Sequence, residues 1–314
     1  MSAEPGMGER WATIDVGTNT VLLLVAERRG AALAPLLERA EITRLGRGVD
    51  ATGRLDPGAI RDTVAVLADY ARAARGLGAR IVACVATSAA RDAVNGAEFF
   101  DAARAAAGLA PEVIAGEEEA RLVWSSAWRD FGRVGEPLAV LDVGGGSTEL
   151  SFGDGPAPRG RASLQVGAVR LTERHVRGDP PSADEVQALR SAAREAVRPL
   201  AAMAGRPAGG RLVGVAGTVT TLSAVAQALP AYDAERVHGA ALALAEVERL
   251  AGTLAALTVR ERAALRGMEP KRADVILAGA LVVAEAMRAL GFDRLTVSDR
   301  GVRWGLLYER VERA

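Results

Sequence analysis

The sequence predicts an α/β protein built from two related halves that enclose a ligand cleft. The first observation is a repeated pattern, "WATIDVGTNTVLLLVAE" at residues 11–27 and "LAVLDVGGGSTELSFG" at residues 138–153. Each stretch is an apolar run that reaches an aspartate, passes through small residues and resumes as a strand, which indicates two hairpins aimed at one place. The second observation is an alternation of predicted strands and helices over 314 residues, enough for two domains.

The first half is predicted to continue its hairpin with strands and crossover helices. A strand and a glycine-bearing loop that contains Arg44 and Arg47 come next. Asp56 is a typical N-cap residue and Pro57 suits a first helical turn, so a helix is expected up to about Gly76. The remaining elements of this half are a strand at 79–86, a helix from about residue 95, a short strand at 111–116 and a helix at 117–128.

The second half restarts at the second hairpin and is predicted to close with a helix. Its elements are a segment at 161–176, a helix-rich section at 182–204, a strand at 211–217, a helix at 218–229, two further helical blocks, a strand at 293–299 and the closing helix at 300–314. No low-complexity linker separates the halves. We place the domains at 1–125 and 126–314, and the closing helix is a candidate to pack back on the first domain. A cleft between packed halves is the expected ligand site.

The composition indicates a soluble globular protein. Apolar residues make up 49% and charged residues 25% of the chain, and the formal net charge is zero, so no global field attracts a polyanion. No apolar run approaches the length of a membrane span, and the first residues lack a basic segment followed by an apolar one. We therefore expect a cytoplasmic protein without nucleic-acid or membrane partners. The single cysteine, Cys84, is expected to be a buried thiol.

The glycines of the hairpins admit two interpretations. They can simply form tight turns, because glycine adopts backbone angles that other residues avoid. Alternatively, the exposed backbone N–H groups of two such turns can form an anion-binding nest. The repetition of the turn, with Gly17 and Gly144 each two residues after an aspartate, favours a phosphate clamp.

Further motifs make the chain resemble the exopolyphosphatase and guanosine pentaphosphate phosphohydrolase family, Ppx/GppA, of the actin, Hsp70 and sugar kinase superfamily. The resemblance covers nearly the whole chain and lies in the segments "IDVGTNTVLLLVAE", "TRLGRGVDATGRL", "VATSAARDAVNGAEF", "VIAGEEEARL", "LDVGGGSTEL", "LQVGAVRLTE", "VAGTVTTL", "PKRADVILAGALV" and "VSDRGVRWGLL". "GEEEARL" shortly before "DVGGGSTEL" is the specific sign, because kinases and actins lack that pairing. The resemblance implies two actin-like (RNase H-like) domains with an interdomain active-site cleft.

The resemblance also assigns expected roles to residues. Cleavage of a terminal phosphate needs donors for the transferred group, a cation and a group that orients water. Expected phosphate-binding residues are Gly17, Thr18, Asn19, Gly144, Gly145, Gly146 and Ser147. Asp142, with Asp15 and Glu149, offers oxygen ligands suited to Mg²⁺. Glu119 is the expected general base and Arg91 a phosphate contact, whereas Glu117 suits an acidic first turn of a helix.

Several other residues are weaker candidates. Arg44, Arg47, Arg170 and Arg300 are candidate members of a track along a longer anionic chain. "GTVTTL" at 217–222 lies where superfamily relatives bind adenosine, or else only packs a turn. Leu22 and Trp304 depart from the residues that relatives carry; we expect a lost substrate contact at the first and altered packing at the second. His175 and His238 are too few for the histidine–aspartate domain of longer family members.

The expected function is Mg²⁺-dependent hydrolysis of the terminal phosphate of inorganic polyphosphate by in-line attack of water. A monovalent cation is a further candidate cofactor, and the resemblance implies a homodimer. The nearest competing function is hydrolysis of guanosine pentaphosphate, which presents a terminal phosphate to the same clamp. The sequence is also compatible with an ATP-dependent kinase of the superfamily and with a non-catalytic protein that binds nucleotide or polyphosphate.

Overall fold

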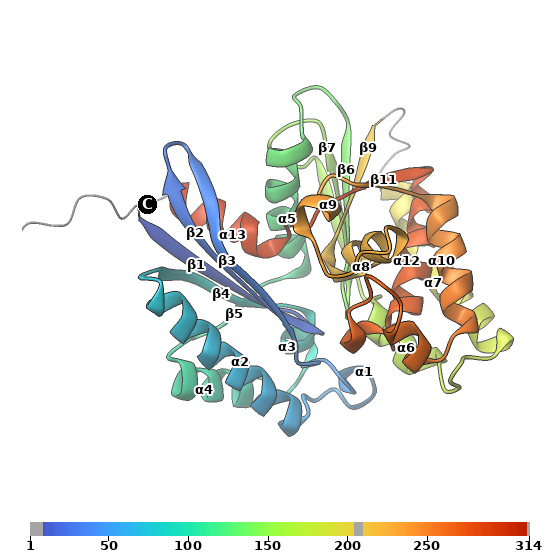
Figure 1. Cartoon of the computed structure of the whole chain (residues 1–314), viewed down its shortest axis with the longest axis horizontal. Helices are drawn as coiled ribbons and strands as arrows, with labels where there is room; N and C mark the ends of the chain where they lie inside the picture. Colours follow the sequence, from blue (N-terminus) through green and yellow to red (C-terminus); the bar gives the residue numbers. More distant parts are fainter. Residues whose placement is uncertain (1–8, 204–209, 313–314) are drawn as a thin grey trace, which may run out of the picture.

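The first of two β-sheets lies in the N-terminal half of the chain (Figure 1). The computed structural model describes residues 9–203 and 210–312. The strand order is β3-β2-β1-β4-β5, in which β1, β2 and β3 are antiparallel and β1, β4 and β5 are parallel. The strands are β1 Arg10–Val16, β2 Thr20–Arg29, β3 Ala32–Ile42, β4 Arg80–Ala86 and β5 Glu112–Val113.

The helices α2 and α4 pack together and cover one face of this sheet (Figure 1). Asp56 caps α2 as predicted, because its side chain accepts a hydrogen bond from the Ala59 N–H at 2.9 Å. Alternate residues of β1, Ala12, Ile14 and Val16, point into the core formed with these helices. The helices of this half are α1 Val49–Thr52, α2 Pro57–Gly76, α3 Ser88–Asp92, α4 Gly96–Ala107 and α5 Gly116–Phe131.

The second sheet has the strand order β10-β11-β9-β6-β7-β8. β6 pairs with β7 in an antiparallel hairpin and with β9 in parallel, which repeats the arrangement of β1 with β2 and β4. This repetition confirms that the two similar sequence stretches build equivalent hairpins. The strands are β6 Leu138–Val143, β7 Thr148–Gly153, β8 Gly160–Leu164, β9 Arg211–Val215, β10 Ala241–Ala243 and β11 Arg294–Val297.

Helix α12 is the buried centre of the second half and packs against α7, α10, α6 and α8. Its one buried carboxylate, Glu285, is paired with Arg190 and Arg194 of α7. The remaining helices are α6 Ala168–His175, α7 Ala183–Met203, α8 Ala216–Ala226, α9 Ala234–Val237, α10 Leu244–Ala256, α11 Val259–Ala263, η1 Pro270–Arg272, α12 Ile276–Leu290 and α13 Val302–Glu312. None of the helices in the described ranges is long and apolar enough to span a membrane.

Helices α5 and α13 lie between the two sheets (Figure 1). α5 packs on the second sheet, α13 packs on β1, β2 and β4 of the first, and the two helices contact each other. Their contact is close, because a Cβ atom at Gly305 of α13 would lie 2.1 Å from the Leu122 carbonyl oxygen of α5. The boundary placed between residues 125 and 126 falls within α5.

Some expected elements differ in extent. The strand expected at 111–116 is only two residues long, and the helix expected from residue 218 begins at Ala216. Ala216 has φ +71°, in the left-handed region, so the sharp turn from β9 into α8 is made by an alanine and not by the glycine that follows it, Gly217. Residues 1–8, 204–209 and 313–314 of the expected domains and helices lie outside the described residues.

Candidate active site

The site begins with two equivalent turns at strand ends. In the first, the Gly17 N–H donates to the Thr20 carbonyl at 2.9 Å; in the second, the Gly144 N–H donates to the Ser147 carbonyl at 3.0 Å. Each turn directly follows a strand that ends in an aspartate and one further residue. The two short hairpins therefore carry Asp15 and Asp142 to equivalent positions.

The two turns touch, and this contact requires glycine in the second turn. A Cβ atom at Gly145 would lie 3.2 Å from Thr18 Cβ and 3.3 Å from Asn19 Cβ. A Cβ atom at Gly146 would lie 2.7 Å from Thr18 Oγ1 and 2.6 Å from Ser88 Oγ, closer than real Cβ atoms approach. The absence of side chains at these positions therefore lets the two halves of the molecule meet.

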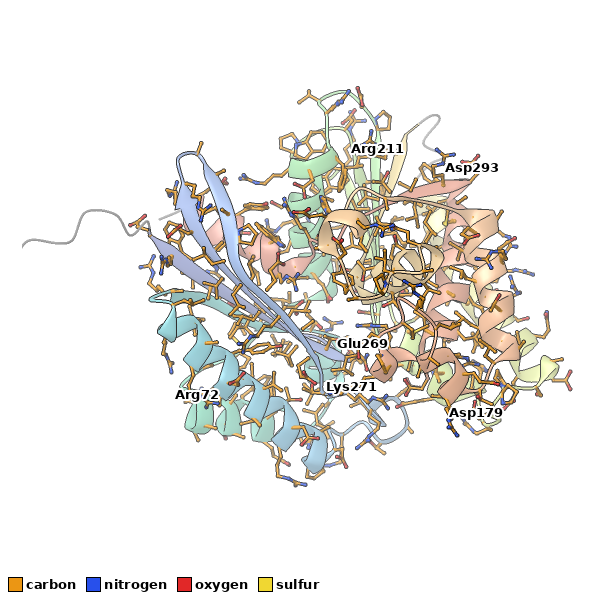
Figure 2. The ribbon with its side chains drawn as sticks, viewed as in Figure 1. Arg72, Asp179, Arg211, Glu269, Lys271 and Asp293 are labelled. Carbon is orange, nitrogen blue, oxygen red and sulfur yellow. The ribbon has the colours of Figure 1, made fainter. Side chains whose placement is uncertain are left out.

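A cleft of about 480 Å³ opens where the turns meet. Its walls come from both halves of the chain, including β2, the N-terminus of α8 and the segment around η1. Figure 2 shows Glu269 and Lys271 of that segment near the ends of β2 and β3, where Lys271 is paired with Glu41. The predicted residues that line the cleft are Asp15, Gly17, Thr18, Asn19, Glu119, Asp142, Gly144, Gly145, Gly146 and Ser147.

Four buried carboxylates are gathered in and beside the cleft. Burial and the charge of Asp142 raise the pKa of Asp15 to about 7, although Arg303 acts in the opposite sense. Burial raises the pKa of Asp142 as well. Burial, followed by the charges of Glu149 and Asp142, raises the pKa of Glu119 well above its usual value. Such carboxyls can hold or accept protons near neutral pH.

The donor set suits a hard cation. Among the described residues, Asp15 Oδ1, Glu119 Oε2 and Glu149 Oε2 are buried oxygens without a hydrogen-bond partner. Glu149 Oε1 accepts from Ser163 Oγ at 2.7 Å. No three His, Cys, Asp or Glu side chains in the described ranges are grouped closely enough to hold a metal ion on their own. Mg²⁺ commonly uses one or two carboxylates together with water and phosphate oxygens, so the residues present fit that mode.

Arg91 lies behind Glu119 rather than in the cleft wall. Its Nη1 donates to the Ile114 carbonyl at 2.9 Å and lies 3.9 Å from Glu119 Oε2. Nη2 is buried without a partner in the described structure. This placement lets Arg91 stabilise the charged form of Glu119, in addition to any phosphate contact.

Comparison with known proteins gives consistent results. The model of the Ppx/GppA phosphatase family matches residues 24–314. A protein named exopolyphosphatase 2 from Mycobacterium tuberculosis is 43% identical over 311 residues, 95% of this chain and 97% of the relative. The chain belongs to the Ppx/GppA phosphatase family. As a member of this family it is a hydrolase, as the sequence predicted.

Solved structures of relatives match the fold. The Ppx/GppA family member from Aquifex aeolicus has a TM-score of 0.81 at 34% identity, covering 97% of this chain and 98% of that one. An exopolyphosphatase from Cytophaga hutchinsonii has a TM-score of 0.88 at 25% identity, covering 98% and 99%. The predicted α/β fold of two actin-like domains is therefore confirmed for this Ppx/GppA protein.

The four weaker arginine candidates do not line the cleft in the described structure of this Ppx/GppA protein. Arg44 pairs with Asp274 at 2.9 Å, and Arg47 lies 3.7 Å from Asp56. Arg300 pairs with Asp130 at 2.8 Å, and Arg170 is held by two aspartates. Each of these arginines has an acidic neighbour and none contributes to the cleft wall, so their track along a substrate stays a prediction.

Two other arginines line the cleft and were not singled out from the sequence. Arg272 Nη2 donates to Thr20 Oγ1 at 3.2 Å, and its guanidinium fills the space beside Gly217, where a Cβ would be 2.4 Å away. Arg303 is buried and donates to Glu38 Oε2 at 2.6 Å. Both lie in Ppx/GppA-like motifs, "PKRADVILAGALV" and "VSDRGVRWGLL", which was the signal that could have identified them.

The remaining predicted positions have diverse surroundings. Leu22 and residues 217, 218, 220 and 221 of "GTVTTL" line the cleft, whereas Trp304 is buried with Trp11 and Leu24 in the contact between α13 and the first sheet. Trp304 is thus a packing residue, as expected. His238 lies 3.1 Å from Asp299 Oδ1 and 3.6 Å from Asp130 Oδ2.

Proposed function

We propose that this chain is an exopolyphosphatase that hydrolyses the terminal phosphate of inorganic polyphosphate. The observation that carries the proposal is the position of the Glu119 carboxylate. This carboxylate is buried and lines the cleft beside the two glycine turns, and its Oε2 has no hydrogen-bond partner among the described residues. A carboxylate with a raised pKa in this position suits the activation of water. The names of the relatives support the choice of substrate.

In the proposed reaction, N–H groups of the two turns other than those of Gly17 and Gly144, which donate within the turns, bind the oxygens of the terminal phosphate. Glu119 accepts a proton from water as the water oxygen attacks phosphorus. The bond from that phosphorus to the bridging oxygen breaks, so the products are inorganic phosphate and a chain one unit shorter. Donors oriented before the reaction supply most of the acceleration, because they need no rearrangement when charge develops.

Asp142, with Asp15 and Glu149, would hold Mg²⁺. A bound Mg²⁺ supplies charge neutralisation at the phosphate oxygens. Arg272 and Arg303 would attract the anionic chain into the cleft, since they are the cations of its described walls. We further propose a cytoplasmic homodimer.

Guanosine pentaphosphate is the second candidate substrate. The outer cleft has an apolar wall that includes Leu22, Ala231 and Met268, and Tyr232 lies there with 56% of its surface exposed. Such a wall suits a flat nucleoside better than it suits a chain of phosphates.

Phosphate release tests the proposal. The substrates are short polyphosphate, long polyphosphate, guanosine pentaphosphate and ATP, each with and without Mg²⁺, and the proteins are the parent chain and Glu119→Gln. We expect metal-dependent release from polyphosphate, and a kcat lower by about 10²-fold or more in the variant, the usual scale for a general base. Substrate binding should remain.

Glu117→Gln is the matched control, because Glu117 is exposed on the same helical turn. It should leave kcat close to the parent value. An active Glu119→Gln protein would reject the role of Glu119. Transfer of phosphate from ATP to an acceptor would identify a kinase, and substrate binding without release would identify a binding protein.

A further inference from the structure

A cluster of charged side chains joins the two halves of the molecule beside the second glycine turn. Its centre is Arg170 of α6, whose side chain is only 13% exposed. Arg170 Nε donates to the Gly146 carbonyl at 2.9 Å, Nη1 donates to Asp50 Oδ1, and Nη2 donates to Asp92 Oδ2 at 2.7 Å. One guanidinium therefore holds the turn of the second half and two aspartates of the first.

The partners of Arg170 are themselves held in place. Asp50 also accepts two hydrogen bonds from Arg174, and these bonds and those from Arg170 lower the pKa of Asp50. Asp92 accepts from Ser88 Oγ at 3.3 Å. Nearby, the Gly48 N–H donates to Glu173 Oε1 at 2.9 Å. Arg170 and Arg174 of the second half and Asp50 and Asp92 of the first therefore form a connected network across the two halves, in which two arginines face two aspartates.

The network lies next to the phosphate-binding turns. Gly146, whose carbonyl accepts from Arg170, is the residue that contacts Thr18 and Ser88 so closely that a Cβ would not fit. Asp92 is the last residue of α3, and α3 also contains Ser88 and Arg91. A shift of Arg170 would therefore change the spacing between the second turn and the elements that face it.

We propose that Arg170 is a positioning residue that sets the spacing of the two phosphate-binding turns. This inference rests on the proposed function, and it gives Arg170 a role distinct from contact with substrate. Only an arginine suits the position, since its planar fork reaches a carbonyl and two carboxylates in three directions, whereas a lysine offers a single charged nitrogen. Misplacement of a binding group by about 1 Å can cost about 10²-fold in rate.

The test compares Arg170→Ala with Arg174→Ala. Arg174 is the matched control, because it also bonds Asp50 but has no bond to the turn among the described hydrogen bonds. With short polyphosphate and Mg²⁺, Arg170→Ala is expected to lower kcat by about tenfold or more, with a smaller change in KM. Arg174→Ala should keep kcat near the parent value. Added guanidinium should restore part of the kcat of Arg170→Ala.

A merely structural role predicts a different result. Both variants would then unfold at lower temperature, while kcat per folded molecule stayed unchanged, and this outcome overturns the proposal. An equal loss of kcat in the two variants also overturns it. If Arg170→Ala does not fold, Asp92→Asn provides the test, because it removes the charge that Nη2 contacts with almost no change of shape. We expect it to lower kcat in the same direction, and an unchanged kcat counts against the proposal.

A measurement without substrate separates this proposal from the proposed function. Hydrogen exchange is followed at the amides of residues 144–147 and 88–92. Arg170→Ala should speed exchange in both segments, and Arg174→Ala should not. If the parent chain releases no phosphate from polyphosphate, the proposed function fails, and the exchange experiment still decides on Arg170. Unchanged exchange in Arg170→Ala would overturn the positioning role.

Discussion

The pKa of Asp15 shows how burial in the site affects a single side chain. Its pKa rises from 3.8 to about 7 in the folded protein, chiefly through burial and then through Asp142. Between these pH values the folded protein binds more protons than the unfolded chain. The free energy of unfolding therefore falls as pH rises through this window, by about 1.4 kcal/mol per pH unit for one fully shifted group. Burial of these carboxylates therefore destabilises the folded protein at neutral pH.

This leads to a prediction on pH. In the presence of a chelator, the unfolding free energy from urea titrations should fall as pH rises from about 5 to about 7, and added Mg²⁺ should flatten the slope because it favours the charged carboxylates. Carboxylates with lowered pKa values, such as Glu185 at about 2, act only at more acidic pH. Asp15→Asn should reduce the slope. Stability that rises over this range without metal would contradict the prediction.

Site residues whose structural neighbours are close in the sequence could be predicted, whereas those whose neighbours are far away in the sequence were missed. Asp15 and Asp142 could be placed because each ends a strand of a recognisable hairpin. Arg272 reaches the cleft from a segment about 250 residues away from its partner Thr20. Arg170 was expected on a substrate track, because a sequence does not show that Asp50 and Asp92 of the other half surround it.

The close contact between the two glycine turns can be tested by adding a single methyl group to the second turn. Gly146→Ala would place a Cβ 2.6 Å from Ser88 Oγ, 2.7 Å from Thr18 Oγ1 and 3.2 Å from Ser88 Cβ, so both hydroxyls must rotate away and the segment that carries Ser88 must shift. We expect kcat/KM for polyphosphate to fall by about tenfold or more. Gly155→Ala, in open space after the same hairpin, should keep the parent value. Equal activity of the two variants would show that the spacing of the turns does not limit catalysis.

Helix ends illustrate what local chemistry can and cannot predict. The N-terminus of α2 was predictable because Asp56 caps it through its own side chain. The start of α8 was not, because the residue in the left-handed conformation is an alanine, Ala216, and not the glycine that follows it. The contacts of α8 with β6 and α12 in the folded protein must outweigh that local cost, which is about 1–2 kcal/mol.

In the whole molecule, α5 and α13 connect the two sheets. One shared core contains Val85 of β4, Leu122 of α5, Val140 of β6 and Leu306 of α13. Because α13 follows the second half in the chain yet packs on the first sheet, the first sheet stays partly uncovered until α13 has packed onto it. We therefore expect the two halves to unfold together in a single transition.

The crossing of α13 and α5 allows a paired test of this connection. Gly305→Ala would place a Cβ 2.1 Å from the Leu122 carbonyl oxygen, so the helices must separate, and overpacking of this kind costs about 1–3 kcal/mol. Gly252→Ala makes the same change in α10, where nothing lies within 4 Å, and should stabilise by about 0.5–1 kcal/mol through helix propensity. Urea titrations should therefore shift in opposite directions for the two variants. A stabilised Gly305→Ala protein would mean that α5 and α13 do not cross closely in solution, and the single unfolding transition would lose its structural basis.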